Sequence, residues 1–190
     1  MRVLLLASLV LSACTPIRSV WLRTDWDATQ ANQIKRIQVL VSPLPENRED
    51  LGALWGLLAK EYINEHLDFL VYSARWAENL SPRDACAAPL DGILLLQPLI
   101  RRKGNWLFVS AQAQLYSCHE HQVLWRAHGR LTGPVADRLF LATAATYAER
   151  LGEPVRDYVA ASFRLLQQLA DRLPKPRLTE ADIDEKIDLD

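Results

Sequence analysis

Hydrophobic side chains recur along the chain with two different spacings, which predict strands and helices. Apolar and polar residues alternate over residues 106–117, as in a half-buried antiparallel strand. Short apolar runs predict four further strands, over residues 34–42, 69–72, 92–100 and 123–131. Pro98 interrupts one run and indicates an edge or a bulge there. Turn residues at 102–105 and 119–121 join the last three strands into a meander.

A spacing of three to four residues predicts the helices. Apolar residues from Leu51 to Ile63 lie on one face of a helix, and Glu49 and Asp50 suit the positive end of its dipole. Two more helices are expected over residues 136–151 and 154–173. The resulting order predicts an α/β (α+β) fold with a mixed, mostly antiparallel sheet and helices packed on it. We place this single globular domain at residues 34–174.

The N-terminal residues predict export and lipidation. Arg2 precedes a charge-free apolar run that is too short to span a membrane. Leu11-Ser12-Ala13-Cys14 then resembles the bacterial lipobox. The resemblance implies cleavage after Ala13 and acylation of Cys14; the alternative is an ordinary secretory signal with a chance cysteine.

Residues 1–13 then become a lipoprotein signal peptide and residues 14–33 a lipidated tether. At the other end, prolines stop the last helix and the acidic, polar residues after them predict a C-terminal tail at residues 175–190. Residues 20–22 and Trp26 of the tether could pack back onto the domain. Thr15 is not the aspartate that often retains lipoproteins at the inner membrane, which favours the periplasmic face of the outer membrane.

Two cysteines remain once Cys14 carries lipid, and an oxidising compartment favours a disulfide between them. If the strands at 92–100 and 106–117 form a hairpin, Leu90 lies nearly opposite Cys118. Cys86 is a few residues before Leu90, in a loop that can bend back. A Cys86–Cys118 disulfide is therefore expected, and two separate buried thiols are the alternative.

Little in the sequence indicates catalysis or a cofactor. His119 and His121 could present two imidazoles to a metal, but we interpret them as part of a polar turn, so no metal is predicted. No Gly-x-Ser-x-Gly elbow and no glycine-rich phosphate loop are present. The net charge of −1 gives no reason to expect nucleic acid. We therefore predict a protein that is not an enzyme and needs no cofactor.

Exposed aromatic and basic residues are the better candidates for function. The proposed interaction surface consists of Trp21, Trp26, Trp76, Arg101, Arg102, Lys103 and Trp106. Tryptophan is enriched at interfaces because it offers a large rigid area with a polar group. The basic run beside Trp106 could contact an anionic surface such as lipid headgroups. The alternatives are that the tryptophans cap the core and that the basic run is a solvated turn.

Several short motifs occur in an order that resembles a lipoprotein family from myxobacteria and leptospires. They are Lys35-Arg36-Ile37, residues 61–66, Cys86, Tyr116-Ser117-Cys118, Val123-Leu124-Trp125, residues 147–152 and residues 173–176. More distantly, the layout is similar to the small α/β domain of lipoproteins that assemble envelope machinery. The first resemblance implies no activity, and the second is a fold-level analogy.

The leading hypothesis is a lipid-anchored domain that binds a protein of the envelope without catalysing a reaction. The alternative is a carrier of a lipid or another small ligand, with a pocket between the sheet and the helices. An enzyme comes third. An apolar cavity would favour the carrier, whereas a filled core and an exposed apolar patch would favour the protein-binding module.

Overall fold

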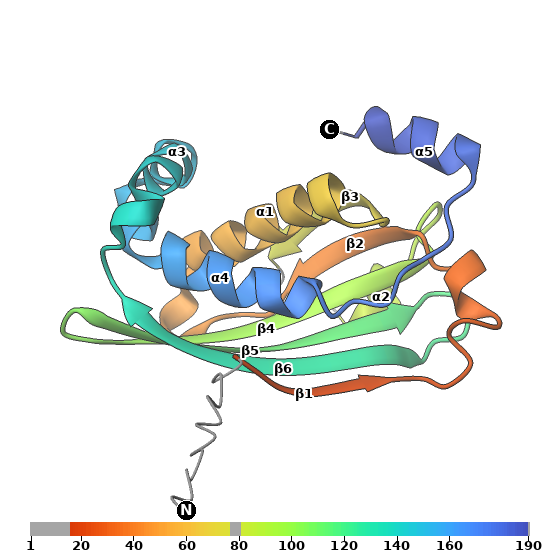
Figure 1. The fold of residues 1–190 in the computed structure, drawn as a ribbon, viewed down its shortest axis with the longest axis horizontal. Coiled ribbons are helices and arrows are strands. Elements are labelled where there is room, and N and C mark those ends of the chain that lie inside the picture. Colours follow the sequence, from red (N-terminus) through yellow and green to blue (C-terminus); the bar gives the residue numbers. More distant parts are fainter. Residues whose placement is uncertain (1–15, 77–80, 190) are drawn as a thin grey trace, which may run out of the picture.

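A single sheet organises the chain. The computed structural model describes residues 16–76 and 81–189, and its six strands are ordered β1-β6-β5-β4-β2-β3 (Figure 1). The strands are β1 (Ile17–Leu22), β2 (Arg36–Val41), β3 (Leu70–Trp76), β4 (Gly92–Lys103), β5 (Trp106–Ser117) and β6 (Val123–Pro134). β2 runs parallel to β3 and β4, and the other pairs are antiparallel. The predicted mixed, mostly antiparallel sheet is confirmed.

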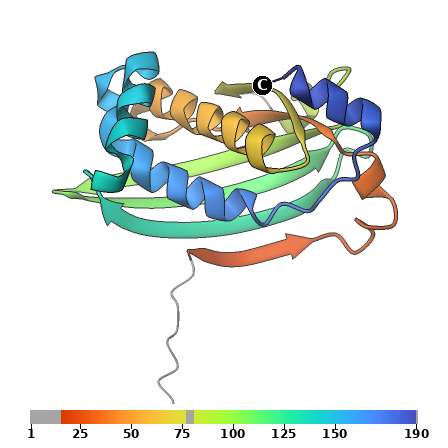
Figure 2. The ribbon, with the colours of Figure 1, turned by 45° about the horizontal axis from the view of Figure 1, so that its top comes forward.

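Two long helices cover one face of this sheet. The helices of the described ranges are α1 (Glu49–His66), α2 (Pro82–Ala85), α3 (Leu141–Leu151), α4 (Val159–Ala170) and α5 (Glu180–Ile187), with short 3-10 turns η1 (Gln30–Asn32), η2 (Pro45–Asn47), η3 (Arg138–Phe140) and η4 (Glu153–Tyr158). α1 and α4 lie side by side along the sheet (Figures 1 and 2). Within the described ranges, no helix is long and apolar enough to cross a membrane.

The core lies between the sheet and these two helices. Alternate residues of β5 point toward the helices and are buried, as are Trp125 of β6 and Leu58 of α1. Leu165 and Leu166 of α4 complete the contact and are essentially inaccessible to solvent. The apolar residues that recur every two positions in the strands and every three to four positions in the helices therefore pack together in one layer.

Pro98 lies in β4, which has a neighbouring strand on each side. The proline nevertheless interrupts no hydrogen bonding between strands. The Leu96 carbonyl accepts a hydrogen bond from the Ser42 N–H at 2.9 Å, on the β2 side. Backbone groups two residues apart point the same way, so the Pro98 nitrogen faces the same side. β2 has ended at Val41. The sequence prediction of an edge at Pro98 is thus explained by a neighbouring strand that stops short.

The predicted tether at 14–33 differs from the structure. Residues 17–22 form β1, which pairs with β6 between Trp125 and Gly129, so the folded part begins before residue 34. Trp26 is 2% exposed and its indole N–H donates to the Lys175 carbonyl at 3.2 Å. The pattern missed β1 because five of its six residues are exposed and the sixth is only partly buried.

The C-terminal tail, predicted at 175–190, contains an ordered helix. Thr179 and Asp182 form the reciprocal cap of α5. Asp182 is 3% exposed and pairs with Lys35 at 2.5 Å and with Arg36 at 2.9 Å. These contacts attach α5 beside the start of β2.

The predicted Cys86–Cys118 disulfide is present, with the two Cα atoms 5.4 Å apart. It fixes α2 against the face of the sheet opposite α1 and α4. There Ala85 packs with Leu40 and Ile93 in a small second core. This segment covers the far end of β4 and leaves the end near the β4–β5 turn open. We call the rest of that face, toward the β4–β5 turn, the helix-free face.

Candidate functional site

The helix-free face of the sheet exposes large apolar side chains near the β4–β5 turn. Trp106 is 54% exposed, Phe108 is 45% exposed and Leu99 is 38% exposed. Phe108 pairs with Arg101 on β4 and with Thr132 on β6, so these side chains share one face. A shallow groove of about 430 Å³ lies between them.

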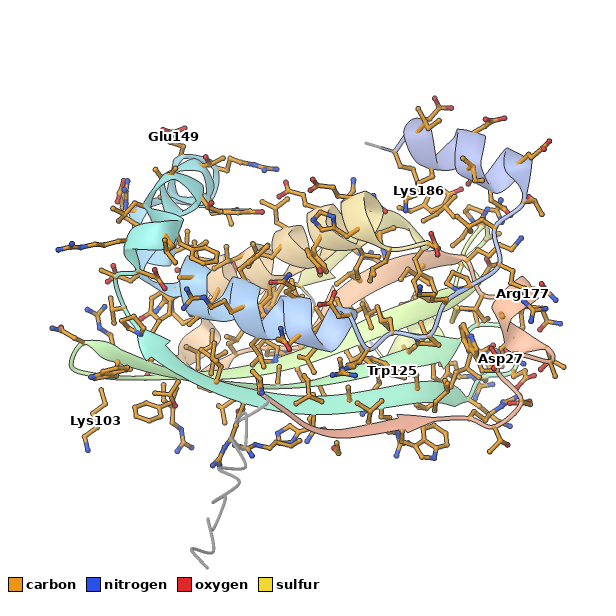
Figure 3. All side chains as sticks on the ribbon, in the orientation of Figure 1. Asp27, Lys103, Trp125, Glu149, Arg177 and Lys186 are labelled. Carbon is orange, nitrogen blue, oxygen red and sulfur yellow. A yellow bond between two sulfur atoms is a disulfide. The ribbon has the colours of Figure 1, made fainter. Side chains whose placement is uncertain are left out.

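Basic residues flank this apolar group and continue along the same face of the sheet. Ser110 pairs with Arg130, Trp106 with Lys103 and Gln114 with Arg126, which places the three basic residues on the helix-free side. Figure 3 shows Lys103 pointing from the turn to the side away from the helices. We call this surface the basic sheet face; it comprises Leu99, Arg101, Lys103, Trp106, Phe108, Arg126 and Arg130.

Part of the proposed interaction surface therefore comes together. Arg101, Lys103 and Trp106 lie on the basic sheet face, whereas Arg102 points the other way and pairs with Asp157 at 2.8 Å. Trp21 lies on the same side of the sheet but on β1, opposite Arg126, whose guanidinium is 5.8 Å from the indole ring centre. The strand register separates Trp21 from Trp106 along the sheet.

Two of the proposed tryptophans do not belong to this surface. Trp26 is buried in the core, as described above. Trp76, at the end of β3, is partly buried and packs closely against Gly52 of α1. A Cβ atom added to Gly52 would come within 2.3 Å of the Trp76 indole. Both cap the core, which was the alternative interpretation of the sequence. The interaction-surface assignment was wrong for these two residues.

The sequence analysis did not assign Phe108 and Arg130 to the interaction surface, although the position of Phe108 in its strand is unusual. The buried phase of β5 consists of the odd-numbered residues from Leu107 to Leu115. Phe108 is a large apolar residue in the opposite phase, where polar residues are expected. Arg130 had no such signal, because one arginine among the exposed residues of a strand is ordinary.

A second exposed apolar group lies on the helix side. Leu139 of η3 is 84% exposed and Leu141 at the start of α3 is 58% exposed; we call them the leucine pair. The turn beneath them is held firmly. The Asp137 carboxylate accepts the Leu139 N–H at 3.0 Å and pairs with Arg164 at 2.7 Å.

Phe140 completes the support of this turn. Its ring centre lies 5.7 Å from that of Phe163 on α4, and the Arg164 guanidinium is 4.9 Å above it. The backbone is thus fixed from below while both leucines point outward.

The space between sheet and helices is filled. The cavity that Ile63, Leu94, Trp125 and Leu166 line has a volume of about 10 Å³. This volume is too small for an organic ligand. An open groove of about 510 Å³ runs on the outside, between η2, Arg102 and Tyr158.

The ionisable groups are arranged as structural pairs. Burial and a hydrogen bond to Glu61 raise the pKa of Tyr147 well above its ordinary value. His119 lies in the predicted turn after β5, and its Nε2 atom is 3.4 Å from the Oδ1 atom of Asp91. Across residues 16–76 and 81–189, no group of three or more His, Cys, Asp or Glu side chains is placed to hold a metal ion. Cys14 lies outside the described residues.

The chain was compared with known proteins. No family model matches it, and no curated protein matches it. Among solved structures, it is similar to the PelC dodecamer from Paraburkholderia phytofirmans, with 15% identity, coverage of 77% of this chain and 91% of that one, and a TM-score of 0.45. It is also similar to the hypothetical protein CT253 from Chlamydia trachomatis, with 13% identity, 73% and 94% coverage and a TM-score of 0.47.

The lipoprotein GNA1162 from Neisseria meningitidis is a third similar structure, with 13% identity, 61% and 96% coverage and a TM-score of 0.37. These likenesses concern the fold of the chain. The resemblance to the lipoproteins of myxobacteria and leptospires stays a prediction.

Proposed function

We propose that this chain is a lipid-anchored lipoprotein of the bacterial envelope that binds another envelope protein and catalyses no reaction. The lipobox-like Leu11-Ser12-Ala13-Cys14 supports the anchor. Thr15 after the cysteine supports the periplasmic face of the outer membrane.

The leucine pair carries the protein-binding part of the proposal. Single exposed leucines are ordinary on protein surfaces. Here, however, Asp137 and Phe140 fix the turn so that both leucines are held outward. A rigid apolar projection loses little conformational entropy when a partner covers it, which is how interface anchors gain affinity.

The alternative function, a carrier with a ligand between sheet and helices, has less support. The residual cavity there is about 10 Å³, and Trp125 and Leu166 fill the space. A lipid chain would have to displace packed core side chains, each of which contributes on the order of 2–5 kcal/mol. Binding on the outer surface requires no such displacement.

In-cell photocrosslinking tests the proposal. A photoreactive amino acid replaces Leu139 in the full chain, and a matched chain carries it at Ile187 of α5, which is 68% exposed. We expect a discrete crosslinked protein from position 139 and none from position 187. The double substitution Leu139→Ser and Leu141→Ser should abolish co-purification of that protein, with fatty-acid labelling of Cys14 unchanged. Identical crosslinks from both positions, or none from 139, would contradict the proposal.

A further inference from the structure

The basic sheet face has a charge pattern that distinguishes it from the rest of the surface. On the helix-free side, β4, β5 and β6 present Arg101, Lys103, Arg126 and Arg130. The positions between these residues are polar but uncharged or apolar, apart from His128. In the part of the chain that the structure describes, none of the four basic residues forms a salt bridge, and β4, β5 and β6 themselves contain no acidic residue.

Arg102 shows the contrast within a single strand. It lies between Arg101 and Lys103 but points to the helix side, where Asp157 neutralises it at 2.8 Å. Basic residues are therefore paired on the helix side of β4 and left open on the sheet face. An extended positive surface with no acidic residues attracts an anionic surface.

The first residues that the structure describes lie at the outer edge of β6, next to Arg130. The Pro16 carbonyl accepts the Arg130 N–H at 2.9 Å, and Ile17 lies opposite Gly129. Cys14 is two residues before Pro16 in the sequence, and two residues of chain span about 7 Å at most. A lipid on Cys14 would therefore be tethered close to the Pro16–Arg130 hydrogen bond.

We infer that the basic sheet face rests on the anionic headgroup layer of the membrane into which the Cys14 lipid inserts. The four basic side chains would face lipid phosphates, because polybasic surfaces next to an anchor are attracted to anionic lipids. Trp106 and Phe108 would reach the interfacial level, where aromatic rings with one polar and one apolar side are favoured. The groove of about 430 Å³ between Phe108 and Arg130 would lie at headgroup depth.

This inference rests on the anchor of the proposed function but not on its protein partner. Helices α1, α3 and α4 lie on the opposite side of the sheet (Figure 2). The leucine pair, on the helix side, would then point away from the bilayer and stay accessible.

Depth measurements on the lipidated full chain test the inference. Phe108→Cys introduces a thiol for an environment-sensitive fluorophore, and Leu141→Cys is the matched control on the helix side. Cys86 and Cys118 are joined and Cys14 carries lipid, so the new thiol takes the label. Each protein is reconstituted into vesicles of phosphatidylcholine alone or with added phosphatidylglycerol. Lipids with a quencher in their acyl chains report depth.

The expected result is a blue shift and quenching at position 108 on the anionic vesicles, with neither change at position 141. On neutral vesicles the label at 108 should stay water-exposed. Arg101→Glu with Arg130→Glu should remove the shift at 108, while the protein still floats with the vesicles through its lipid. Thermal melting checks that this variant folds.

Three results would overturn the inference. A label at 108 that stays in water on anionic vesicles would show that the face is free for another partner, such as an acidic protein. Equal quenching at 108 and 141 would show no preferred orientation. Failure of the unlabelled chain to float with any vesicle would refute the anchor itself, and with it the proposed function.

Discussion

At the scale of single residues, Asp182 attaches the C-terminal segment to the domain. Its carboxylate accepts hydrogen bonds from Lys35 at 2.5 Å, from Arg36 at 2.9 Å and from the Thr179 N–H at 2.8 Å. Burial by itself raises the pKa of this carboxyl, but the hydrogen bonds from Lys35 and Thr179 outweigh burial and bring the pKa well below its ordinary value. The ionised carboxylate is thus favoured in the folded state.

The sign of the pH dependence follows from this shift. Because the pKa is lower in the folded than in the unfolded chain, Asp182 contributes stability above its unfolded pKa of about 4. That contribution is lost as the pH falls from about 4 toward the lower folded-state pKa. Asp182→Asn should weaken the docking of α5 by about 1.5–3 kcal/mol at neutral pH, and the difference from the wild type should shrink in acid.

Hydrogen exchange of the α5 amides measures this effect. The matched control is Asp184→Asn on the same helix, where the side chain is exposed. Equal protection of α5 in both variants at neutral pH would show that the Lys35–Asp182 pair does not hold the helix.

At the scale of elements, the sequence predicted those whose burial follows a regular period. The meander β4–β5–β6 and the helices α1 and α4 bury one face each, so their apolar residues recur at two or at three to four positions. The sequence pattern did not predict β1, because an edge strand with little burial needs no regular spacing of apolar residues. Hydrogen bonds to β6 define this strand. The burial of Trp26 was not predicted either, because a single buried residue in an irregular segment leaves no repeating pattern.

The candidate site could be predicted only in part, for a related reason. Trp106 and Arg101 were visible as an aromatic beside a basic run at a turn. Arg130 joins them through strand register, since it pairs with Ser110 on the neighbouring strand. The leucine pair depends on the Asp137 cap and on Phe140 packing against α4. Such contacts between distant segments are set by tertiary structure.

The Cys86–Cys118 disulfide attaches α2 to the end of the meander, and its loss should be measurable. It closes a loop between residues 32 positions apart. In the chain-entropy model, closing a loop of this size stabilises the fold by roughly 3–4 kcal/mol. Replacing both cysteines by serine should lower the free energy of unfolding by about that amount, as measured by urea denaturation.

Reductant supplies the internal control for this prediction. It should lower the stability of the wild type toward that of the double variant and leave the variant itself unchanged. A wild type whose alkylation without reductant modifies both Cys86 and Cys118 would refute the bridge.

At the scale of the whole molecule, the sheet divides two surfaces that have different chemistry. The basic sheet face lies on one side, with the Pro16 end of β1 hydrogen-bonded to Arg130. The leucine pair belongs to η3 and to the start of α3, and α3 lies on the other side of the sheet (Figure 1). A lipid at Cys14 would bring the first side to the membrane, and the thickness of the filled core would hold the second side away from it. The rigidity of that core is therefore what both proposals depend on.

The packing of α4 on the sheet gives the last prediction. Leu166 is 1% exposed, and it lines the residual core space with Ile63 of α1, Leu94 of β4 and Trp125 of β6. Leu166→Asp removes a packed side chain and buries a charge, so it should cost about 4 kcal/mol or more. A typical domain has a total stability of about 5–15 kcal/mol, so the thermal midpoint should fall sharply. Leu141→Asp, at a position 58% exposed, should change stability by about 0.5 kcal/mol at most while abolishing the position-139 crosslink. An unchanged midpoint for Leu166→Asp would place this residue at the surface and contradict the packing of the helices on the sheet.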